Sequence, residues 1–466
     1  MQKVFDEVNT LDRRCYEQFG LNEDILMEHA AVSMLNFIEQ KEQKGSRILI
    51  VSGAGNNGAD GIALSRLLQG DYRVTLFLPF GAKSHMAKQQ LVRAELAGVK
   101  PLISYECLIQ EYDLIADCLF GSGLNRQLDQ NSQKIIEKLN QSCGYKLSCD
   151  IPSGIDNNGT IDSVAFKADT TITMGALKSS LFNDEVKDFT GEIKVAALGL
   201  QRKLYETDTN CYMLDMDDLK LPNRDTLDTH KGSFGHFAVI VGQKTGAGML
   251  CAEAGYSLGA GLVSVIDHHH LNPPYHIMEN HKLPENTTAI AMGMGLGNYE
   301  KNEVQTILSN DIPKVIDADL FHETDILDVL EKENNILTPH PKEFCSLLRI
   351  TGIADIDLKT LQKNRLSYVR KFSEIYPNVV LLLKGANVII SKGDKVYINP
   401  HGSSRLSFGG SGDVLAGFIG SLLAQGYDPL SAAINGSLVH VKTAQQYKGN
   451  DFSMTPFDLI NGVKEI

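Results

Sequence analysis

The sequence predicts two consecutive α/β units, each built on a mainly parallel sheet. Three observations lead to this fold class. Apolar runs of strand length alternate with helical segments, many of these strands end in glycine-rich or oxygen-rich loops, and one polar stretch at residues 200–224 interrupts the pattern. A length of 466 residues also exceeds what a single ordinary core organises.

The amino-acid composition excludes several classes of function for this chain. Hydrophobic residues make up 43% of the chain and charged residues 22%, which predicts a soluble globular protein. The formal net charge of -13 and the absence of a basic block argue against a nucleic-acid surface, so amides, helix ends or a cation must hold any anionic ligand. The eight cysteines include no Cys-x-x-Cys pair, which favours a reducing cytoplasm. We find neither a signal peptide nor a membrane span, and we expect no membrane partner.

The first half begins with an expected helical region over residues 1–45. A buried strand is expected at 48–52, followed by the glycine-rich loop 53–61 and a helix at 62–68. This order offers backbone amides to a phosphate, although a purely structural turn would also need glycines. Further strands are expected at 74–78, 114–116 and 146–149, with a helix at 86–97.

Oxygen-bearing side chains follow three of these strands. They are Asn57 and Asp60, then Asp117, then Asp150 and Ser153. Because ligands bind at the carboxyl edge of open parallel sheets, we expect the three loops to converge. Carboxylate, amide and hydroxyl oxygens suit a hard cation, monovalent or divalent, and Asp150 could then be free for proton transfer.

Three motifs in residues 1–215 resemble those of NAD(P)H-hydrate epimerases: Gly53–Gly61 (GAGNNGADG), Asp117–Leu124 (DCLFGSGL) and Asp150–Asp156 (DIPSGID). The resemblance implies that two loops line the hydrated nicotinamide nucleotide, through Asn56, Asn57, Gly58, Ala59 and Asp60 and through Gly121, Ser122, Gly123, Leu124, Asn125, Arg126 and Gln127. It further implies that Asn57, Asp117 and Ser153 bind K⁺. Asp150 would contact the substrate and act as the acid/base. This chain departs from the family at Ala59, where glycine is usual, and at Asn125-Arg126.

The second half repeats the α/β pattern. Strands are expected at 237–241, 262–266, 288–292, 314–316, 336–338, 379–383, 388–391 and 395–398, with a helix through 252–258. The stretch Gly409–Gly417 (GGSGDVLAG) then places one carboxylate, Asp413, in a glycine-dense turn before an apolar helical run. A phosphate would repel this carboxylate unless it accepts a proton from a hydroxyl about to meet the phosphate. The alternative is a structural turn with an aspartate near the helix N-terminus.

Several other segments of the second half carry candidate binding residues. Lys384 and His340 follow strand ends upstream of the Gly409–Gly417 turn, and each is also compatible with a solvated loop. The run His268–His270 invites a metal interpretation, but consecutive strand residues point to opposite faces, so a surface position is favoured.

The second half resembles the ribokinase-like, nucleotide-dependent NAD(P)H-hydrate dehydratases. The resemblance rests on residues 230–236, 259–263, 295–297, 317–319, 338–341 and 383–386 and on the Gly-Gly-Ser-Gly-Asp turn. It implies that Ala247, Gly297, His340 and Asp413 contact the hydrate, and that Lys384, Gly385, Ala386, Asn387, Val388 and Gly412 contact the adenine nucleotide. Asp413 would be catalytic. The chain departs from the family at Lys342, at Val388 and at Arg405, which could add a phosphate contact or distort its loop.

Together the resemblances imply a Rossmann-like three-layer domain with a parallel sheet at residues 1–215 and a ribokinase-like α/β domain at 222–466. The first would epimerise the R and S hydrates of NADH and NADPH. The second would dehydrate the S form at the expense of ADP or ATP with Mg²⁺, while K⁺ serves the epimerase site. We expect a homo-oligomer and no nucleic-acid partner.

Two alternatives stay open at this point. The second half could be a small-molecule (vitamin) kinase, with the first half a potassium-dependent nucleotide-binding module. The first half could also be only a nucleotide sensor.

Overall fold

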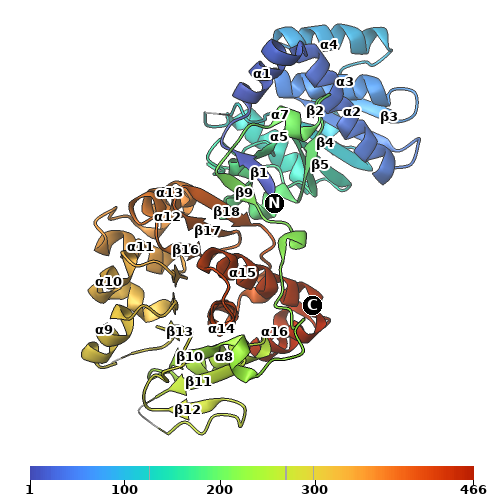
Figure 1. Ribbon diagram of the computed structural model, residues 1–466. Helices are drawn as coiled ribbons and strands as arrows, with labels where there is room; N and C mark the ends of the chain where they lie inside the picture. The colour runs from blue at the N-terminus through green and yellow to red at the C-terminus, as the bar shows by residue number, and fades with distance from the viewer. Residues whose placement is uncertain (125, 268–269, 298) are drawn as a thin grey trace. The chain divides into compact units, whose positions relative to one another are not determined.

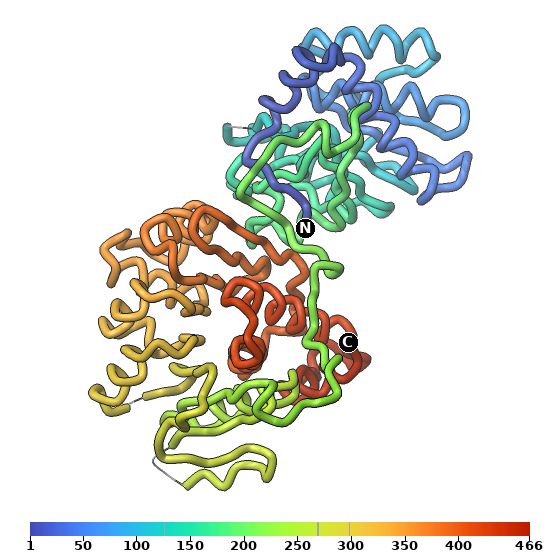
Figure 2. The backbone as a smooth tube through the Cα atoms, in the orientation of Figure 1, coloured from blue at the N-terminus to red at the C-terminus, as the bar shows by residue number. Residues whose placement is uncertain are grey.

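The computed structural model describes residues 1–124, 126–267, 270–297 and 299–466. The chain divides into two compact units (Figures 1 and 2). Lys3–Thr209 forms one unit, and Asn210–Ile466 with Met1–Gln2 forms the other. Each unit is described by itself below.

The unit Lys3–Thr209 is built on a six-stranded sheet with the strand order β3-β2-β4-β5-β6-β8. All of its neighbouring strands pair in parallel, as predicted. The strands are β2 (Arg47–Ser52), β3 (Arg73–Phe77), β4 (Leu114–Cys118), β5 (Tyr145–Cys149), β6 (Thr170–Met174) and β8 (Glu192–Ala196).

Helices cover both faces of this sheet (Figure 1). Ile48 and Ile50 of β2 pack into a core shared with α1 (Asn9–Phe19), α2 (Glu23–Lys41), α3 (Asn56–Leu68) and α4 (His85–Leu96). Leu49 and Val51 pack on the other face, with α5 (Gln130–Gln141). This alternation is what a strand buried on both faces requires. The short helices α6 (Lys187–Thr190) and α7 (Arg202–Tyr205) complete the unit.

Two local predictions in this unit were wrong. Helix α3 begins at Asn56 and not at Ile62, so much of the expected loop is helical. A Cβ at Gly58 would lie 1.9 Å from the Gly53 carbonyl oxygen, so close backbone packing explains this glycine. The expected all-helical start contains β1 (Gln2–Phe5), whose Val4 and Phe5 pair in parallel with β7 (Leu177–Lys178).

The second unit contains a longer sheet with the strand order β12-β11-β10-β13-β14-β15-β16-β17-β18-β9. Neighbours are parallel from β12 to β16, antiparallel on both sides of β17, and parallel again between β18 and β9. The strands are β9 (Cys211–Met213), β10 (His236–Ile240), β11 (Leu262–Ile266), β12 (Met278–Asn280), β13 (Ala289–Met292), β14 (Lys314–Ile316), β15 (Asn335–Leu337), β16 (Val380–Leu383), β17 (Val388–Lys392) and β18 (Lys395–Asn399).

The core of this unit surrounds α14 (Ser411–Ala424), which is almost entirely buried after its first turn. Helices α8 (Thr245–Ser257), α15 (Pro429–Gln446) and α16 (Pro456–Gly462) pack against it. The remaining helices are α9 (Lys301–Ser309), α10 (Leu327–Leu330), α11 (Pro341–Ile350), α12 (Leu358–Lys363) and α13 (Arg365–Ile375). Within the described ranges, no helix combines the length and apolar character needed to cross a bilayer.

Candidate active sites

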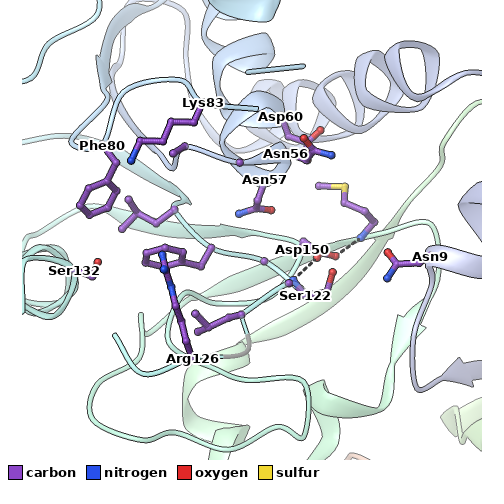
Figure 3. Close-up of a pocket in the computed structure, with 18 of the residues that line it drawn as sticks. Asn9, Asn56, Asn57, Asp60, Phe80, Lys83, Ser122, Arg126, Ser132 and Asp150 are labelled. Carbon is purple, nitrogen blue, oxygen red and sulfur yellow. Dashed lines mark hydrogen bonds between the residues drawn. The ribbon is translucent and has the colours of Figure 1, made fainter. Parts of the chain in front are cut away.

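A cavity of about 730 Å³ opens in the unit Lys3–Thr209, at the carboxyl ends of β2, β4 and β5 (Figure 3). Of the residues predicted for this site, nine line it: Asn56, Asn57, Asp60, Gly121, Ser122, Gly123, Leu124, Arg126 and Asp150. Gly58 and Ala59 are buried inside α3, and Gln127 is exposed and does not line the cavity. Asn125 lies outside the described residues.

The Asp150 carboxylate is surrounded by hydrogen-bond donors. Lys178 Nζ lies 2.6 Å from Oδ1, and the Ser122 amide donates to Oδ2 at 3.0 Å. The Met174 amide donates to Oδ1 at 3.2 Å. Asp150 itself adopts a left-handed backbone, with φ of 70°. Burial alone would raise the pKa of Asp150, but the Lys178 ammonium and these donors outweigh it and lower the pKa below its ordinary value. Asp150 is therefore a carboxylate that can accept a proton.

Lys178 is the residue of this site that the sequence did not reveal. Its side chain is only 2% exposed, and its ammonium also donates to Thr173 Oγ1 at 2.9 Å and to the Met174 carbonyl at 3.1 Å. It stands on the two-residue strand β7, which was not predicted. The available signal was one lysine after the small and apolar residues 174–177. A buried lysine needs a partner, and Asp150 is that partner.

Asn57 and Asp150 approach each other across Gly121. A Cβ at Gly121 would lie 2.8 Å from Asn57 Oδ1 and 3.0 Å from Asp150 Oδ2, so only glycine fits here without displacing one of them. The Asn57 Nδ2 group is buried and has no hydrogen-bond partner among the described residues. An unsatisfied amide beside a cavity indicates a ligand-binding position.

Asp117 and Ser153 are completely buried next to the loop that carries Gly121. The Ser153 hydroxyl donates to Asp117 Oδ1 at 2.7 Å and the Ser153 amide donates to Oδ2 at 2.8 Å. The Phe120 amide donates to Ser153 Oγ at 2.9 Å, which ties this pair to the loop that carries Gly121. Burial raises the pKa of Asp117 to about 6, although these hydrogen bonds oppose the shift.

The other unit gathers a second set of predicted residues at the carboxyl ends of β14, β15 and β16. Lys384 Nζ forms an ion pair with Asp317 Oδ1 at 2.7 Å. Gly412, in the first turn of α14, faces this pair, since a Cβ there would lie 3.3 Å from Lys384 Nζ. Asp413 follows, in the same turn. Burial and the Asp317 carboxylate raise the pKa of Asp413 to about 6, against the effect of Lys384.

The backbone of Gly410 and the side chain of His440 fix the start of α14. Gly410 takes a left-handed backbone (φ 96°) as the residue before the helix. His440 of α15 is buried, and its Nε2 contacts Ser411 Oγ at 3.1 Å and the Ser411 carbonyl oxygen at 3.0 Å. Burial lowers the pKa of His440 to about 4, so the ring is neutral. No pattern in the sequence singles out His440.

His340 precedes α11 and is held by Glu343. The His340 ring accepts at Nδ1 from the Lys342 and Glu343 amides, and its Nε2 lies 3.1 Å from Glu343 Oε1. Nδ1 therefore acts as an acceptor and Nε2 as the donor. Burial raises the pKa of Glu343 to about 7, and burial together with Lys384 lowers that of His340. Lys342 is itself exposed.

The remaining predicted residues occupy neighbouring loops. The Gly297 amide donates to Asp319 Oδ2 at 3.0 Å, and the Ala247 amide donates to the Lys244 carbonyl at the start of α8. Gly385 and Ala386 are exposed between β16 and β17, Asn387 is buried beside them, and Val388 opens β17. The structure thus brings Lys384, Gly412, Asp413 and His340 together around Asp317, with Gly297 beside Asp319.

Two sequence expectations concern residues outside these sites. For Arg405, either a phosphate contact or a distorted loop was considered, and its side chain is engaged with other groups in the structure. Its side chain forms an ion pair with Asp451 at 2.7 Å and donates to the Ala444, Gln445 and Tyr447 carbonyls, so it satisfies the C-terminal end of α15. His270 is 73% exposed and lies 2.9 Å from Glu279, while His268 and His269 fall outside the described residues.

Known proteins resemble this chain over its whole length. A family model described as NAD(P)H-hydrate dehydratase matches residues 237–464, and one described as YjeF-related protein N-terminus matches residues 23–180. The chain is 44% identical over 474 residues to the bifunctional NAD(P)H-hydrate repair enzyme Nnr of Helicobacter pylori, with 100% of both chains covered.

More distant relatives and solved structures also match the chain. The enzyme of the same name from Coxiella burnetii is 32% identical over 470 residues, covering 94% of this chain and 93% of that one. A solved structure described as ADP/ATP-dependent NAD(P)H-hydrate dehydratase from Bacillus subtilis, co-crystallised with ATP/Mg²⁺, is 25% identical with a TM-score of 0.46, covering 55% of this chain and 98% of that chain. On the strength of the two full-length relatives, the chain belongs to the family of bifunctional NAD(P)H-hydrate repair enzymes.

Proposed function

We propose that the two sites work in sequence on hydrated NADH and NADPH. The cavity around Asp150 interconverts the R and S epimers, and the site around Asp413 dehydrates the S form at the expense of ADP or ATP. The observation that carries this proposal is that each unit sets one aspartate near a lysine ammonium at the carboxyl edge of its sheet, Asp150 with Lys178 and Asp413 with Lys384. We assign the epimerase to residues 1–215 and the dehydratase to residues 222–466.

At the epimerase site, Asn56, Asn57, Asp60, Gly121–Leu124 and Arg126 contact the nucleotide, and Asp150 moves a proton. Lys83 and Arg126 also line the cavity and lie apart from Asp150, toward Phe80 (Figure 3). These two cations suit the diphosphate of the dinucleotide. The hydrated ring then lies toward Asp150.

We place a potassium ion among the oxygen groups next to Gly121. Asn57, Asp117 and Ser153 offer amide, carboxylate and hydroxyl oxygens, which are hard donors with little total charge. The buried Asp117 has no cationic side chain among the groups that set its pKa. The ion would supply that charge and position substrate oxygens.

We expect the rate of epimerisation to rise and saturate as K⁺ replaces a large organic cation at constant ionic strength. The unfolding temperature should rise with K⁺ as well, because a ligand that binds only the folded chain stabilises it. Asp117→Asn should remove both effects. An epimerisation rate and an unfolding temperature that do not change with the K⁺ concentration would contradict the assignment.

At the dehydratase site, Asp413 accepts the proton of the ring hydroxyl as that oxygen attacks the terminal phosphoryl group of the nucleotide. The Gly409–Gly412 amides stabilise the charge that develops on the phosphoryl oxygens. Loss of phosphate from the ring, with a proton from the adjacent carbon, restores the double bond. Lys384–Val388 and Gly412 contact the nucleotide, while Ala247, Gly297 and His340 contact the hydrate.

Mg²⁺ would arrive with the nucleotide. Among the described residues no group of three or more His, Cys, Asp or Glu side chains is placed to hold a metal. Mg²⁺ is commonly bound by substrate phosphates and only one or two carboxylates, and Asp317 is the buried carboxylate available here. We further propose a cytoplasmic homo-oligomer, which size-exclusion chromatography with light scattering would test.

The test of the function is to incubate the protein with mixed hydrate epimers and either ADP or ATP, and to follow the reduced-nicotinamide absorbance. We expect the whole pool to return to NADH or NADPH with one phosphate released per ring. Without nucleotide, the epimers should exchange and no NADH should form. A phosphorylated product that accumulates would instead indicate a kinase, and binding without epimer exchange would indicate a sensor.

A further inference from the structure

The epimerase cavity holds a second carboxyl group in an environment opposite to that of Asp150. Asp150 is surrounded by an ammonium and two amides, all of which donate to it. The polar contact recorded for the Asp60 carboxyl is the Cys149 thiol, at 4.0 Å from Oδ2. Within the part of the chain that the structure describes, one carboxyl is therefore surrounded by strong donors, while the other receives a single weak thiol donor.

Asp60 reaches the cavity from a different element than Asp150 does. It stands on α3, one turn after Asn56 and Asn57, while Asp150 follows β5 (Figure 3). Cys149, whose thiol contacts Asp60, directly precedes Asp150 in the chain. The two carboxyls therefore border the same cavity but are carried by different structural elements.

Burial and the charges around Asp60 favour its protonated form. The charged groups that act on it are Asp150 after β5, Asp12 on α1, Glu23 on α2 and Lys178 on β7. Burial has the largest effect and three of these four groups are acidic, so the pKa of Asp60 is raised well above its ordinary value. Paired carboxyls pushed in opposite directions are the arrangement that divides acid and base roles.

We propose that Asp60 is the general acid of the epimerase, paired with Asp150 as its base; this rests on the epimerase function proposed above. The hydroxyl-bearing carbon of the hydrate lies next to the ring nitrogen. Asp60 gives its proton to that hydroxyl, the C–O bond breaks with its electron pair on oxygen, and water leaves. The nitrogen lone pair forms a C=N bond in its place.

Water then adds to the other face of the same carbon. Its oxygen lone pair forms the new C–O bond, the C=N electron pair returns to nitrogen, and Asp150 takes the released proton. Asp60 ends ionised and Asp150 ends protonated. Proton exchange with solvent restores the starting state, so the cycle consumes no oxidant, reductant or cofactor.

Asp12 also borders the cavity, but its carboxyl already has a hydrogen-bond donor. It accepts a hydrogen bond from the buried Tyr205 hydroxyl at 2.7 Å, which holds its carboxyl toward α7. Because the charge of Asp12 acts on Asp60, the control for Asp60→Asn is Asp71→Asn, which makes the same chemical change in an exposed ion pair with Lys44 outside the cavity.

The experiment measures epimer exchange in the full-length protein for wild type, Asp60→Asn, Asp60→Glu and Asp71→Asn, and repeats the wild-type reaction in H₂¹⁸O. General acids typically contribute 10²–10⁴-fold, so Asp60→Asn should lose at least about 100-fold, with partial recovery in Asp60→Glu and wild-type activity in Asp71→Asn. Wild-type activity should fall on the alkaline side as Asp60 ionises, and that limb should vanish in the residual activity of Asp60→Asn. Each exchange should place one ¹⁸O in the product.

Fold integrity of each variant is read from its dehydratase activity and its unfolding temperature. Full epimerase activity in a folded Asp60→Asn variant would overturn the acid role. Retention of the original oxygen would overturn departure of the hydroxyl, because opening of the ring at its C–N bond keeps that oxygen. A wild type without epimerase activity above the spontaneous rate would instead overturn the proposed function.

Discussion

Asp413→Asn should slow dehydration of the S hydrate by about 10²–10⁴-fold, the range that a positioned general base contributes. The substitution keeps the size of the side chain and its place in the first turn of α14, but removes the group that accepts the hydroxyl proton. The buried body of α14 lies after Asp413, so we expect the fold to survive. Retention of more than about a tenth of the activity would remove Asp413 as the base.

The pH dependence of dehydratase activity provides a second test of the role of Asp413. The pKa of Asp413 is raised to about 6, and only the ionised form accepts a proton. Dehydratase activity should therefore fall as the pH drops through about 6, and Asp413→Asn should lack this limb. Asp428→Asn is a suitable control, because Asp428 caps α15 by accepting from the Ser431 amide at 3.1 Å and lies outside the proposed site.

Asp150→Asn should slow epimer exchange by a similar factor while leaving dehydration of the S form intact. Asparagine tolerates the left-handed backbone that this position requires, so the main change is the loss of a proton acceptor opposite Lys178. With mixed epimers and excess nucleotide, only the S fraction should be consumed quickly. The remainder should follow at the spontaneous rate of exchange.

The measurement is the biphasic progress curve of reduced-nicotinamide absorbance. Asp71→Asn is the control, since Asp71 forms an exposed surface ion pair with Lys44 in the same unit and should leave a single fast phase. Loss of both activities in Asp150→Asn would argue against two independent sites. A single fast phase in Asp150→Asn would remove Asp150 from catalysis.

Much of this architecture could be predicted because the signals were local. Buried parallel strands appear as short apolar runs, and β2, β11 and β14 were located within a residue of their ends. The motif after β5 predicted that Asp150 lies at a cavity with the loops after β2 and β4, because the carboxyl ends of parallel strands share one edge. Strands β6 and β8 were missed, since threonine and lysine break their apolar runs.

What could not be predicted depends on contacts between distant segments. Lys178 acquires its role only when β7 places it against Asp150, 28 residues away. Arg405 turns from the expected ligand loop toward the end of α15 because the carbonyls there need a donor, which no local pattern shows. Glu343 did carry a local signal that was not used, namely proline at the first and glutamate at the third position of a helix that begins after His340.

The left-handed backbone of Asp150 costs on the order of 1–2 kcal/mol, which glycine would avoid. Glycine would also leave the Lys178 ammonium buried without its carboxylate, and breaking a buried ion pair in this way costs about 3–5 kcal/mol. The ion pair therefore outweighs the backbone strain, and residue 150 is a position that any effort to stabilise the protein should leave unchanged.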